Sequence, residues 1–385
     1  MIWPAVPALA AGAYYLLAMI AAFRWRNLSQ TTPADDKGPL ARADDIQRSS
    51  ALRVSILKPV HGRDPRFYHA IRSHAVQDYP EFEILFGVSD PADPAIADIE
   101  RLRHEFPDRA ISLHIVRTDA PNAKAGVLAE LSRRAKHPVL LVNDSDILVE
   151  ADYLRRVTAA LSDPSVGLVT CLYRASAGSF ASRAEALGIA TEFAPSVLVA
   201  RLLGAAEFAL GSTMALRAEV LREVGGFEAL EKFLADDYQL GNRIHQLGYR
   251  IVFAPVVVET DLGDGGWGQV WRHQVRWSRT IRVSRPEGYF GYVVTHATFW
   301  SLAALATGAW WAGAFALATR LIAGVWIGAG ILHDRRTIVD AWLIPFRDLF
   351  GFAVWVAGLA GRTVDWRGKK LHLSRDGIIR IAPRG

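Results

Sequence analysis

The sequence contains only one cysteine, Cys171, among its 385 residues. A single cysteine excludes an internal disulfide and any metal site built from several cysteines. Because Cys171 lies in the apolar run 167–172, we expect it to be a buried strand residue and not a nucleophile. The sequence also lacks a block of Lys and Arg and any nucleic-acid-binding motif, although the net charge is +5. We therefore expect no nucleic-acid partner, since arginines beside apolar segments fit anionic lipid surfaces better.

Apolar and aromatic residues are abundant and are concentrated at the two ends of the chain. Hydrophobic residues make up 51% of the sequence and charged residues 22%, with 12 Trp and 17 Phe. The segment 2–23 has no charge and is just long enough to span a bilayer. Arg24 and Arg26 follow it, no basic residue precedes it, and no clear cleavage site follows. This pattern predicts an uncleaved anchor at residues 1–26 with its N-terminus outside; a buried soluble helix is the alternative.

The carboxyl-terminal apolar region, residues 289–361, predicts further membrane segments. Residues 289–332 are typical of two spans joined by a tight turn near 308–313. The stretch 338–361 includes Arg347 and Asp348, and charges in membrane segments usually face a protein interior. This stretch either spans or forms a broken or interfacial helix. Four spans would return the basic tail, residues 362–385, to the outside, so we expect that one segment does not span.

Between the apolar ends, a polar linker at 27–53 precedes an alternation of strands and helices. Strands are predicted at 54–60, 83–88, 111–116 and 139–142, with helices at 64–77, 94–106 and 123–135 between them. This alternation predicts a parallel, doubly wound α/β sheet within a domain at 54–288. The later strands are expected at 166–172, 210–216 and 250–259, and helices at 236–247 and 267–282. The segment 179–203 is either an amphipathic helix at the bilayer surface or a pair of core helices.

Acidic residues follow two of the predicted strands. Asp144-Ser145-Asp146 comes directly after the apolar strand 139–142, and Asp90 follows the strand 83–88. Ligands bind at the carboxyl ends of strands in open α/β sheets, so both positions lie on the expected binding edge. Two carboxylates at a strand end suit a hard divalent cation such as Mg²⁺ or Mn²⁺, with positions open for phosphates. The alternative is an ordinary polar turn after the strand.

Several motifs occur in the same order as in a known group of enzymes. They are Leu57-Lys58-Pro59-Val60-His61-Gly62-Arg63-Asp64-Pro65, Gln77-Asp78-Tyr79-Pro80, Asp90, Asn122-Ala123-Lys124, Asp144-Ser145-Asp146, Asp236-Asp237-Tyr238 and His273-Gln274-Val275-Arg276-Trp277. The series resembles the D, DxD, (E/D)D and (Q/R)xxRW motifs of GT-A glycosyltransferases that are family 2-like. It is more similar still to ceramide glucosyltransferases of family 21, and bacterial hopanoid-pathway glycosyltransferases share the pattern. The chain departs at the first position of the last motif, which is His273, with Gln274 one place later.

The resemblance implies a nucleotide-sugar-binding GT-A domain flanked by transmembrane helices, and a role for each matched residue. Asp237 would be the catalytic base, and Asp144 and Asp146 would hold the divalent metal. The predicted binding residues for a UDP-sugar are Asp90, Lys124, Asp144, Arg276 and Trp277, with Asp236, His273 and Gln274 supporting them. From the residues alone, the alternative for Asp236 and Asp237 is helix capping. For Lys124 it is a solvated helix residue, and for Arg276-Trp277 it is a membrane-interface belt.

The implied activity is inverting transfer of a sugar, expected to be glucose, from a UDP-sugar to the hydroxyl of a membrane lipid such as ceramide. The lipid stays in the bilayer while the donor stays in water, which explains why the chain would be an integral protein of a bacterial inner membrane with its catalytic domain in the cytoplasm. One alternative is transfer of glucose or N-acetylglucosamine to a hopanoid or another polar lipid. Another is a catalytically degenerate membrane scaffold. A polysaccharide synthase would need a larger helix bundle.

Overall fold

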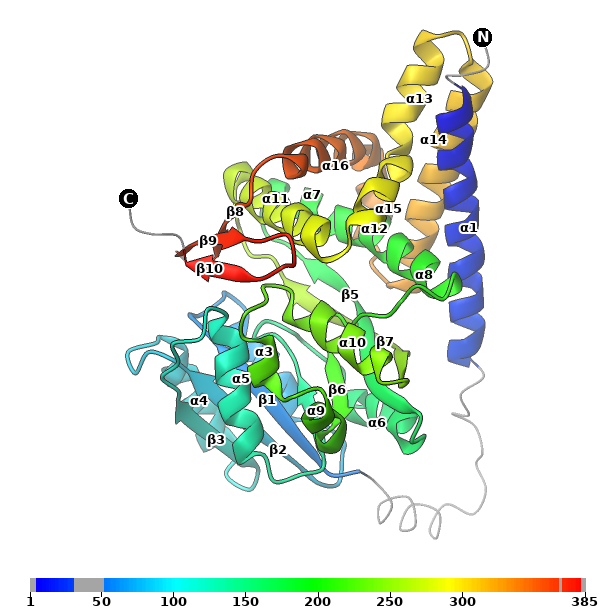
Figure 1. Ribbon diagram of the computed structural model, residues 1–385. Helices are drawn as coiled ribbons and strands as arrows, with labels where there is room; N and C mark the ends of the chain where they lie inside the picture. Colours follow the sequence, from blue (N-terminus) through cyan, green and yellow to red (C-terminus); the bar gives the residue numbers. More distant parts are fainter. Residues whose placement is uncertain (1–4, 31–51, 367–368, 382–385) are drawn as a thin grey trace, which may run out of the picture. The chain divides into compact units, whose positions relative to one another are not determined.

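The computed structural model describes residues 5–30, 52–366 and 369–381 (Figure 1). The chain divides into two compact units. The sheet unit comprises Leu28–Leu172 and Glu207–Asp261, and the helical unit comprises Met1–Asn27, Tyr173–Ala206 and Leu262–Gly385. This division groups residues 173–206 and 262–288 with the apolar helices, whereas the sequence places them in the α/β domain. Most of the predicted linker, residues 31–51, lies outside the described residues.

The main sheet of the described residues has seven strands in the order β3-β2-β1-β4-β6-β5-β7. The strands are β1 (Val54–Val60), β2 (Phe82–Val88), β3 (Ala110–Ile115), β4 (Val139–Val142), β5 (Val166–Ser176), β6 (Met214–Arg217) and β7 (Arg250–Asp261). β1 pairs in parallel with β2 and β4, and β2 with β3, whereas β6 runs antiparallel to both β4 and β5. The predicted doubly wound α/β sheet is therefore confirmed, with the correction that it is mixed and not wholly parallel.

Helices of the sheet unit cover a sheet whose centre is buried on both faces. They are α3 (Phe67–Ala75), α4 (Ala95–Glu105), α5 (Ala123–Arg134), α6 (Tyr153–Thr158), α9 (Ala218–Glu223) and α10 (Asp236–Gln246). Every residue of β1, β2 and β4 is buried. Because successive side chains of a strand point to opposite faces, this pattern requires cover on both sides. On one face, Leu57 and Val142 share a core with Leu128 of α5 and Leu240 of α10. Cys171 is fully buried in β5, as predicted.

The antiparallel direction of β6 brings a further loop to the carboxyl edge of the sheet. Met214, the first residue of β6, pairs with Val142, the last residue of β4. The sequence predicts a strand from Leu210, but that segment instead forms a turn, closed by the Thr213 backbone N–H donating to the Leu210 carbonyl at 3.0 Å. Gly211 therefore lies at the edge where β4 delivers Asp144.

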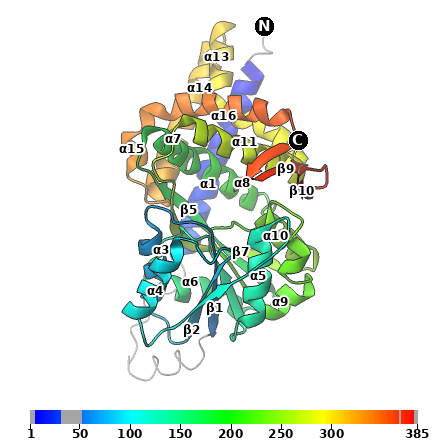
Figure 2. The same cartoon turned by 90° about the vertical axis from the view of Figure 1, so that its left-hand side faces the viewer.

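The helical unit is built from apolar helices and two short π-helical turns. Its helices are α1 (Ala5–Gln30), α7 (Phe180–Gly188), α8 (Ala194–Leu202), α11 (Trp267–Ser284), α12 (Pro286–Gly291), α13 (Ala297–Ala306), α14 (Trp310–Val325), α15 (Arg336–Val339) and α16 (Ile344–Leu359). Figures 1 and 2 show α1, α13 and α14 side by side. Alanines fill their contact, among them Ala8, Ala11, Ala304, Ala312 and Ala316. Small residues allow close approach of helices in the absence of a hydrophobic driving force.

Three helical segments are long and apolar enough to cross a membrane: Ala5–Asn27, Trp310–Ile331 and Ala341–Leu359. The sequence predicts two spans at 289–332, but the structure has one helical segment of sufficient length there, Trp310–Ile331. The other helix, α13, is apolar but has only 10 residues. In both figures α16 runs across the direction of α1 and α14. That direction favours the interfacial alternative for α16. Arg347 and Asp348 in this helix are buried, as the sequence predicts for charges in such a segment.

The predicted basic tail forms a small sheet in its described part. Its antiparallel strands are β8 (Thr363–Trp366), β9 (Lys369–Leu373) and β10 (Ile379–Ile381), in the order β10-β9-β8. Val364, Leu371 and Ile379 are buried, so the tail has a folded apolar face that its charge alone does not reveal.

Candidate functional site

The carboxyl edge of the sheet unit brings together residues from three separate segments. Asp144 follows β4, and Lys124 lies in the first turn of α5, which begins after the N-cap Asn122. Lys124 Nζ lies 2.7 Å from Asp144 Oδ1 and 3.6 Å from Asp236 Oδ2. The structure therefore joins Asp144, Lys124 and Asp236, which are far apart in the sequence, into one charged cluster.

Asp237 is held at the start of α10 and faces the same cluster. Its Oδ1 accepts the Tyr238 backbone N–H at 2.7 Å, and its Oδ2 accepts the Gly211 backbone N–H at 3.0 Å. A Cβ at Gly211 would lie 3.2 Å from Asp144 Oδ2, 3.3 Å from Asp237 Oδ2 and 3.6 Å from Lys124 Nζ. The two carboxylates and the ammonium thus converge on one point beside Gly211. The absence of a side chain there leaves the space between them open.

Burial and charge shift the pKa values of this cluster in ways that suit chemistry. Burial and, second to it, the charge of Asp236 together raise the pKa of Asp237 to about 6. Burial and, second to it, the charge of Asp144 together raise the pKa of Asp146 to about 6. Burial opposes the charged form of Lys124, but the charges of Asp144 and Asp236 outweigh it and raise the pKa of Lys124. A carboxylate with a pKa near neutrality is a better proton acceptor than an ordinary aspartate.

Two side chains that the sequence analysis did not assign support the Asp144–Asp146 loop. Lys58 in β1 is fully buried, and its Nζ donates to the Asp144 carbonyl at 3.0 Å. Burial lowers the pKa of Lys58 to about 7, against the opposing charges of Asp146 and Asp144. The Thr260 hydroxyl donates to Asp146 Oδ2. A lysine inside an otherwise buried strand is rare enough to be a usable sequence signal, because lysine is almost never fully buried without a partner.

Asp144 and Asp146 fit a divalent cation in their donor chemistry. Carboxylate oxygens are the ligands that Mg²⁺ and Mn²⁺ prefer. The raised pKa of Asp146 reflects negative charge that burial and Asp144 leave uncompensated, which a cation would relieve. In the described part of the chain, no group of three or more His, Cys, Asp or Glu side chains is placed to hold a metal. The oxygens of a phosphate-bearing ligand would add to these two carboxylates around a cation.

Asp90 lies at the carboxyl end of β2, next to β1 in the sheet. Its Oδ1 accepts the Ala92 backbone N–H at 2.8 Å, so the carboxylate caps a turn and is exposed. Within the described residues it has no contact with the cluster at Asp144. The structure places Asp90 on the predicted edge of the sheet but does not join it to the other site residues.

The remaining predicted residues belong to α11 in the helical unit. His273 Nδ1 lies 2.6 Å from Glu185 Oε1, and Gln274 Nε2 donates to the same oxygen at 2.8 Å. The rings of His273 and Trp277 lie 4.6 Å apart between centroids. Glu185 is buried, with 4% of its surface exposed. His273 is thus fixed between a carboxylate and the ring of Trp277, the residue that follows Arg276. It is the position where the chain departs from the (Q/R)xxRW pattern.

The contacts of Gln274 continue into a buried ionic network between the apolar helices. Arg347 Nη2 of α16 donates to Gln274 Oε1 at 3.0 Å and lies 3.1 Å from Glu192 Oε2. Arg320 of α14, with no exposed surface, pairs with Asp348 of α16 at 2.6 Å. Glycines make room for these guanidinium groups: a Cβ at position 188 would lie 2.2 Å from Arg347 Nε, and one at position 351 would lie 2.8 Å from its Nη1. The network explains how charged residues are tolerated in these apolar segments.

Gly241 controls how α10, which carries Asp236 and Asp237, packs in the sheet unit. A Cβ at this position would lie 2.4 Å from the Ala209 backbone nitrogen and 2.6 Å from the Phe208 carbonyl carbon. Backbone atoms cannot move aside as a flexible side chain can, so we expect Gly241→Ala to destabilise the protein by about 2 kcal/mol. Chemical denaturation measures this, with Gln246→Ala on the exposed side of α10 as control. Equal stabilities of the two variants would contradict the packing argument.

Comparison with known proteins identifies the family. The chain matches glycosyl transferase family 21 over residues 8–379. It is 28% identical over 207 residues to ceramide glucosyltransferase 3 of Caenorhabditis elegans, and 29% identical over 190 residues to ceramide glucosyltransferase 1 of the same organism. These matches cover 52% and 48% of this chain but 44% and 40% of the relatives, so the chain spans less than half the length of these two proteins.

A solved structure confirms the fold. The mannosyltransferase PcManGT of Pyrobaculum calidifontis, in complex with GDP-Man and Mn²⁺, is 20% identical and superposes with a TM-score of 0.53. The superposition covers 92% of this chain and 99% of that one, and it supports the predicted GT-A architecture. Because the family match extends over most of the sequence, the chain belongs to glycosyl transferase family 21.

Proposed function

We propose that the protein is an inverting glycosyltransferase that moves a sugar, glucose in the first instance, from a UDP-sugar to the hydroxyl of a ceramide-like membrane lipid. The observation that supports this most strongly is the convergence of Asp144, Asp237 and Lys124 beside Gly211 at the carboxyl edge of the sheet. Family membership supplies the reaction class, and the ceramide glucosyltransferase relatives suggest the acceptor. We also propose a bacterial inner-membrane protein with the sheet unit in the cytoplasm, since Arg24 and Arg26 follow the first apolar helix.

The proposed mechanism is a single direct displacement. Asp144 and Asp146 would hold a divalent cation, Mg²⁺ or Mn²⁺, which supplies neutralisation of the charge that develops on the diphosphate leaving group. Lys124 stays charged and adds a fixed positive group beside Asp144. Asp237 accepts the proton of the lipid hydroxyl as that oxygen attacks the anomeric carbon and the bond to the diphosphate breaks. Attack from the face opposite the leaving group converts an α-linked donor into a β-glycoside.

Further binding roles in the proposal follow from the family resemblance. Asp90 would contact the uridine, and Arg276 and Trp277 would bind the diphosphate and the acceptor. Asp236 lies near Lys124, and its charge raises the pKa of Asp237. Its role in the proposal is to increase the basicity of Asp237; it does not itself accept the proton. His273 and Gln274 are positioning residues, because both bond to Glu185 and lie on the same helix as Arg276.

The pH dependence of the reaction tests the role of Asp237. Asp237 must be ionised to accept a proton, and its pKa is raised from 3.8 to about 6. We therefore expect kcat/KM to be constant at neutral pH and to fall about tenfold per pH unit below pH 6. If the acid limb came from Asp146, metal would compete with protons there and the limb would move with the metal concentration. Because we assign the limb to Asp237, raising the metal concentration tenfold should leave it in place. A limb near pH 4, or one that moves with metal, would contradict the assignment of Asp237.

The substrates are tested by UDP release from the purified, detergent-solubilised protein. UDP-glucose or UDP-N-acetylglucosamine is offered with ceramide, diacylglycerol or a hopanoid polyol, with and without divalent metal. The proposal predicts metal-dependent release with UDP-glucose that requires ceramide. Release only with another lipid would keep the enzyme class and replace the acceptor. UDP binding without release for any pair would contradict both proposed substrates, and absence of UDP binding would favour the degenerate scaffold.

A further inference from the structure

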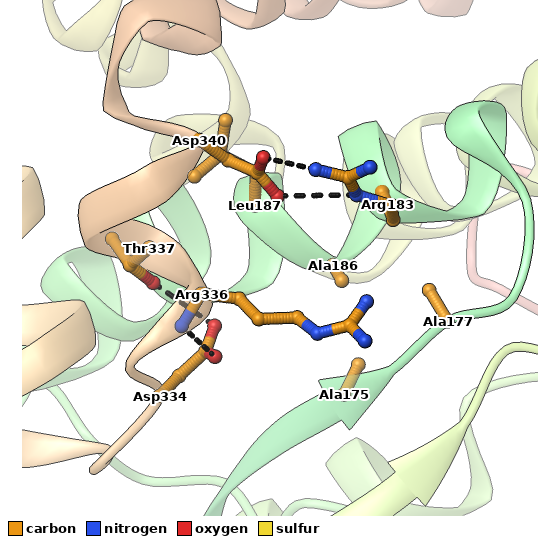
Figure 3. Close-up of a pocket in the computed structure, with 9 residues that line it drawn as sticks. All are labelled: Ala175, Ala177, Arg183, Ala186, Leu187, Asp334, Arg336, Thr337 and Asp340. Atoms are coloured by element: carbon orange, nitrogen blue, oxygen red, sulfur yellow. Dashed lines mark hydrogen bonds and ion pairs between the residues drawn. The ribbon is translucent and has the colours of Figure 1, made fainter.

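The exposed Arg336 side chain lines a small hollow in the helical unit. Figure 3 shows the Arg336 guanidinium directed toward the small side chains of Ala175, Ala177 and Ala186. No hydrogen bond or ion pair of this guanidinium occurs within the described residues; only the backbone N–H of Arg336 is engaged, by Asp334 at 3.1 Å. The three alanines carry no side-chain acceptor, so a small anionic group at this hollow would supply the partner that the guanidinium lacks among the described residues.

The other charges around the hollow are already engaged. Arg183 Nε and Nη2 donate to the Asp340 carboxylate, while Arg183 Nη1 makes no hydrogen bond within the described residues. The Asp334 carboxylate accepts the Arg336 backbone N–H and the Thr337 hydroxyl, the latter at 2.9 Å. Both carboxylates therefore have donors of their own. An incoming anion would find the Arg336 guanidinium, with Arg183 Nη1, as the groups still able to donate.

The hollow lies beside surface that is suited to lipid. It is formed partly by residues 334–340, which connect the apolar segments Trp310–Ile331 and Ala341–Leu359. Charged residues between two such segments belong at the boundary of a membrane. Large apolar side chains next to Arg336 are exposed: Ile338 by 58%, Val339 by 70% and Trp342 by 71%. Exposed Ile and Val favour contact with acyl chains, and Trp is typical of the membrane interface.

We propose that this hollow binds the phosphate of an anionic phospholipid, with Arg336 as its main donor, Arg183 Nη1 assisting, and the acyl chains along Ile338, Val339 and Trp342. The adjacent exposed apolar side chains favour a lipid over free phosphate, which would gain nothing from them. Arg–phosphate hydrogen bonds are charge-assisted and bidentate, and a basic residue at the membrane surface adds attraction to anionic lipid. The site is separate from the proposed sugar transfer and does not depend on it.

Native mass spectrometry of the full chain in detergent tests the proposal, with equal amounts of phosphatidylglycerol and phosphatidylcholine of the same acyl chains. We expect the wild type to retain phosphatidylglycerol in excess and Arg336→Gln to lower that excess about tenfold. Arg335→Gln is the matched control, because Arg335 is also exposed but does not line the hollow. Ala177→Glu, which places a carboxylate opposite the guanidinium, should act like Arg336→Gln.

Three outcomes would overturn the proposal. An unchanged excess in Arg336→Gln would show that the hollow is not the lipid site. Equal losses in Arg336→Gln and Arg335→Gln would show general surface attraction and no defined site. Displacement of phosphatidylglycerol by millimolar inorganic phosphate would make a soluble anion the occupant. Circular dichroism of each variant shows whether it is folded. If Arg336→Gln does not fold, the phosphatidylglycerol excess of Ala177→Glu tests the proposal in its place.

Discussion

Replacing Asp237 with asparagine is expected to lower kcat by roughly a thousandfold, the range over which a positioned general base contributes. Asparagine keeps the size of the side chain and one oxygen that can accept the Gly211 backbone N–H, now at 3.0 Å from Asp237 Oδ2, but its amide nitrogen cannot accept the Tyr238 backbone N–H. It cannot take the proton of the acceptor hydroxyl. We therefore expect turnover to be lost while UDP binding is retained, with a stability loss of about 1 kcal/mol from the hydrogen bond to Tyr238. Single-turnover assays with saturating donor and lipid measure this directly.

The control for Asp237→Asn is Asp152→Asn, because Asp152 is an exposed aspartate ahead of α6 and outside the cluster. Its turnover should be unchanged. Asp236→Asn is the informative neighbour: removal of the Asp236 charge should lower the pKa of Asp237, so the acid limb of the pH profile should move to lower pH. If Asp237→Asn kept most of its activity, another group would have to be the base.

The second large effect is expected from the ion pair between Arg320 and Asp348. Both side chains are buried, and Asp348 also accepts the Thr298 hydroxyl at 2.8 Å. Removing one partner leaves the other charge buried and uncompensated, so Arg320→Met should destabilise the protein by about 4 kcal/mol. The double variant Arg320→Met/Asp348→Leu removes both charges and should recover most of that loss. Denaturant titration in detergent micelles, followed by tryptophan fluorescence, measures each variant.

The exposed pair of Arg103 and Glu100 in α4 supplies a control of the same chemistry. Exposed pairs contribute about 0–1 kcal/mol, so Arg103→Met should be nearly neutral. A double variant of Arg320 and Asp348 that is less stable than Arg320→Met alone would contradict the argument, because it would mean that the charges stabilise the helices beyond compensating each other.

The strands of the α/β region were predictable because they are short apolar runs with clear ends. The strand 54–60 coincides with β1, and the placement of Asp144 after β4 follows from the same pattern. The antiparallel direction of β6 was not predictable, since direction depends on partner strands distant in the sequence. Gly211 reaches the site only through that direction, and no local signal marks it.

The surroundings of the last motif show the same limit. His273 and Gln274 were marked by their position in the motif, but their partner Glu185 lies 88 residues from His273 in the chain. The charged residues Arg347 and Asp348 were predicted to face a protein interior, and they do, yet their partners Glu192 and Arg320 could be found only from the packing of the helices. Helix pairing in the apolar region depends on shape more than on pattern.

The configuration of the product tests the central claim most directly. NMR of the glycolipid formed from UDP-glucose and ceramide identifies both the atom that carries the sugar and the anomeric configuration. Direct displacement with Asp237 as base predicts a β-linked sugar on a lipid hydroxyl. An α-linked product would contradict the single-displacement mechanism, and the absence of any glycolipid from protein that binds UDP-glucose and ceramide would contradict the proposed transfer itself.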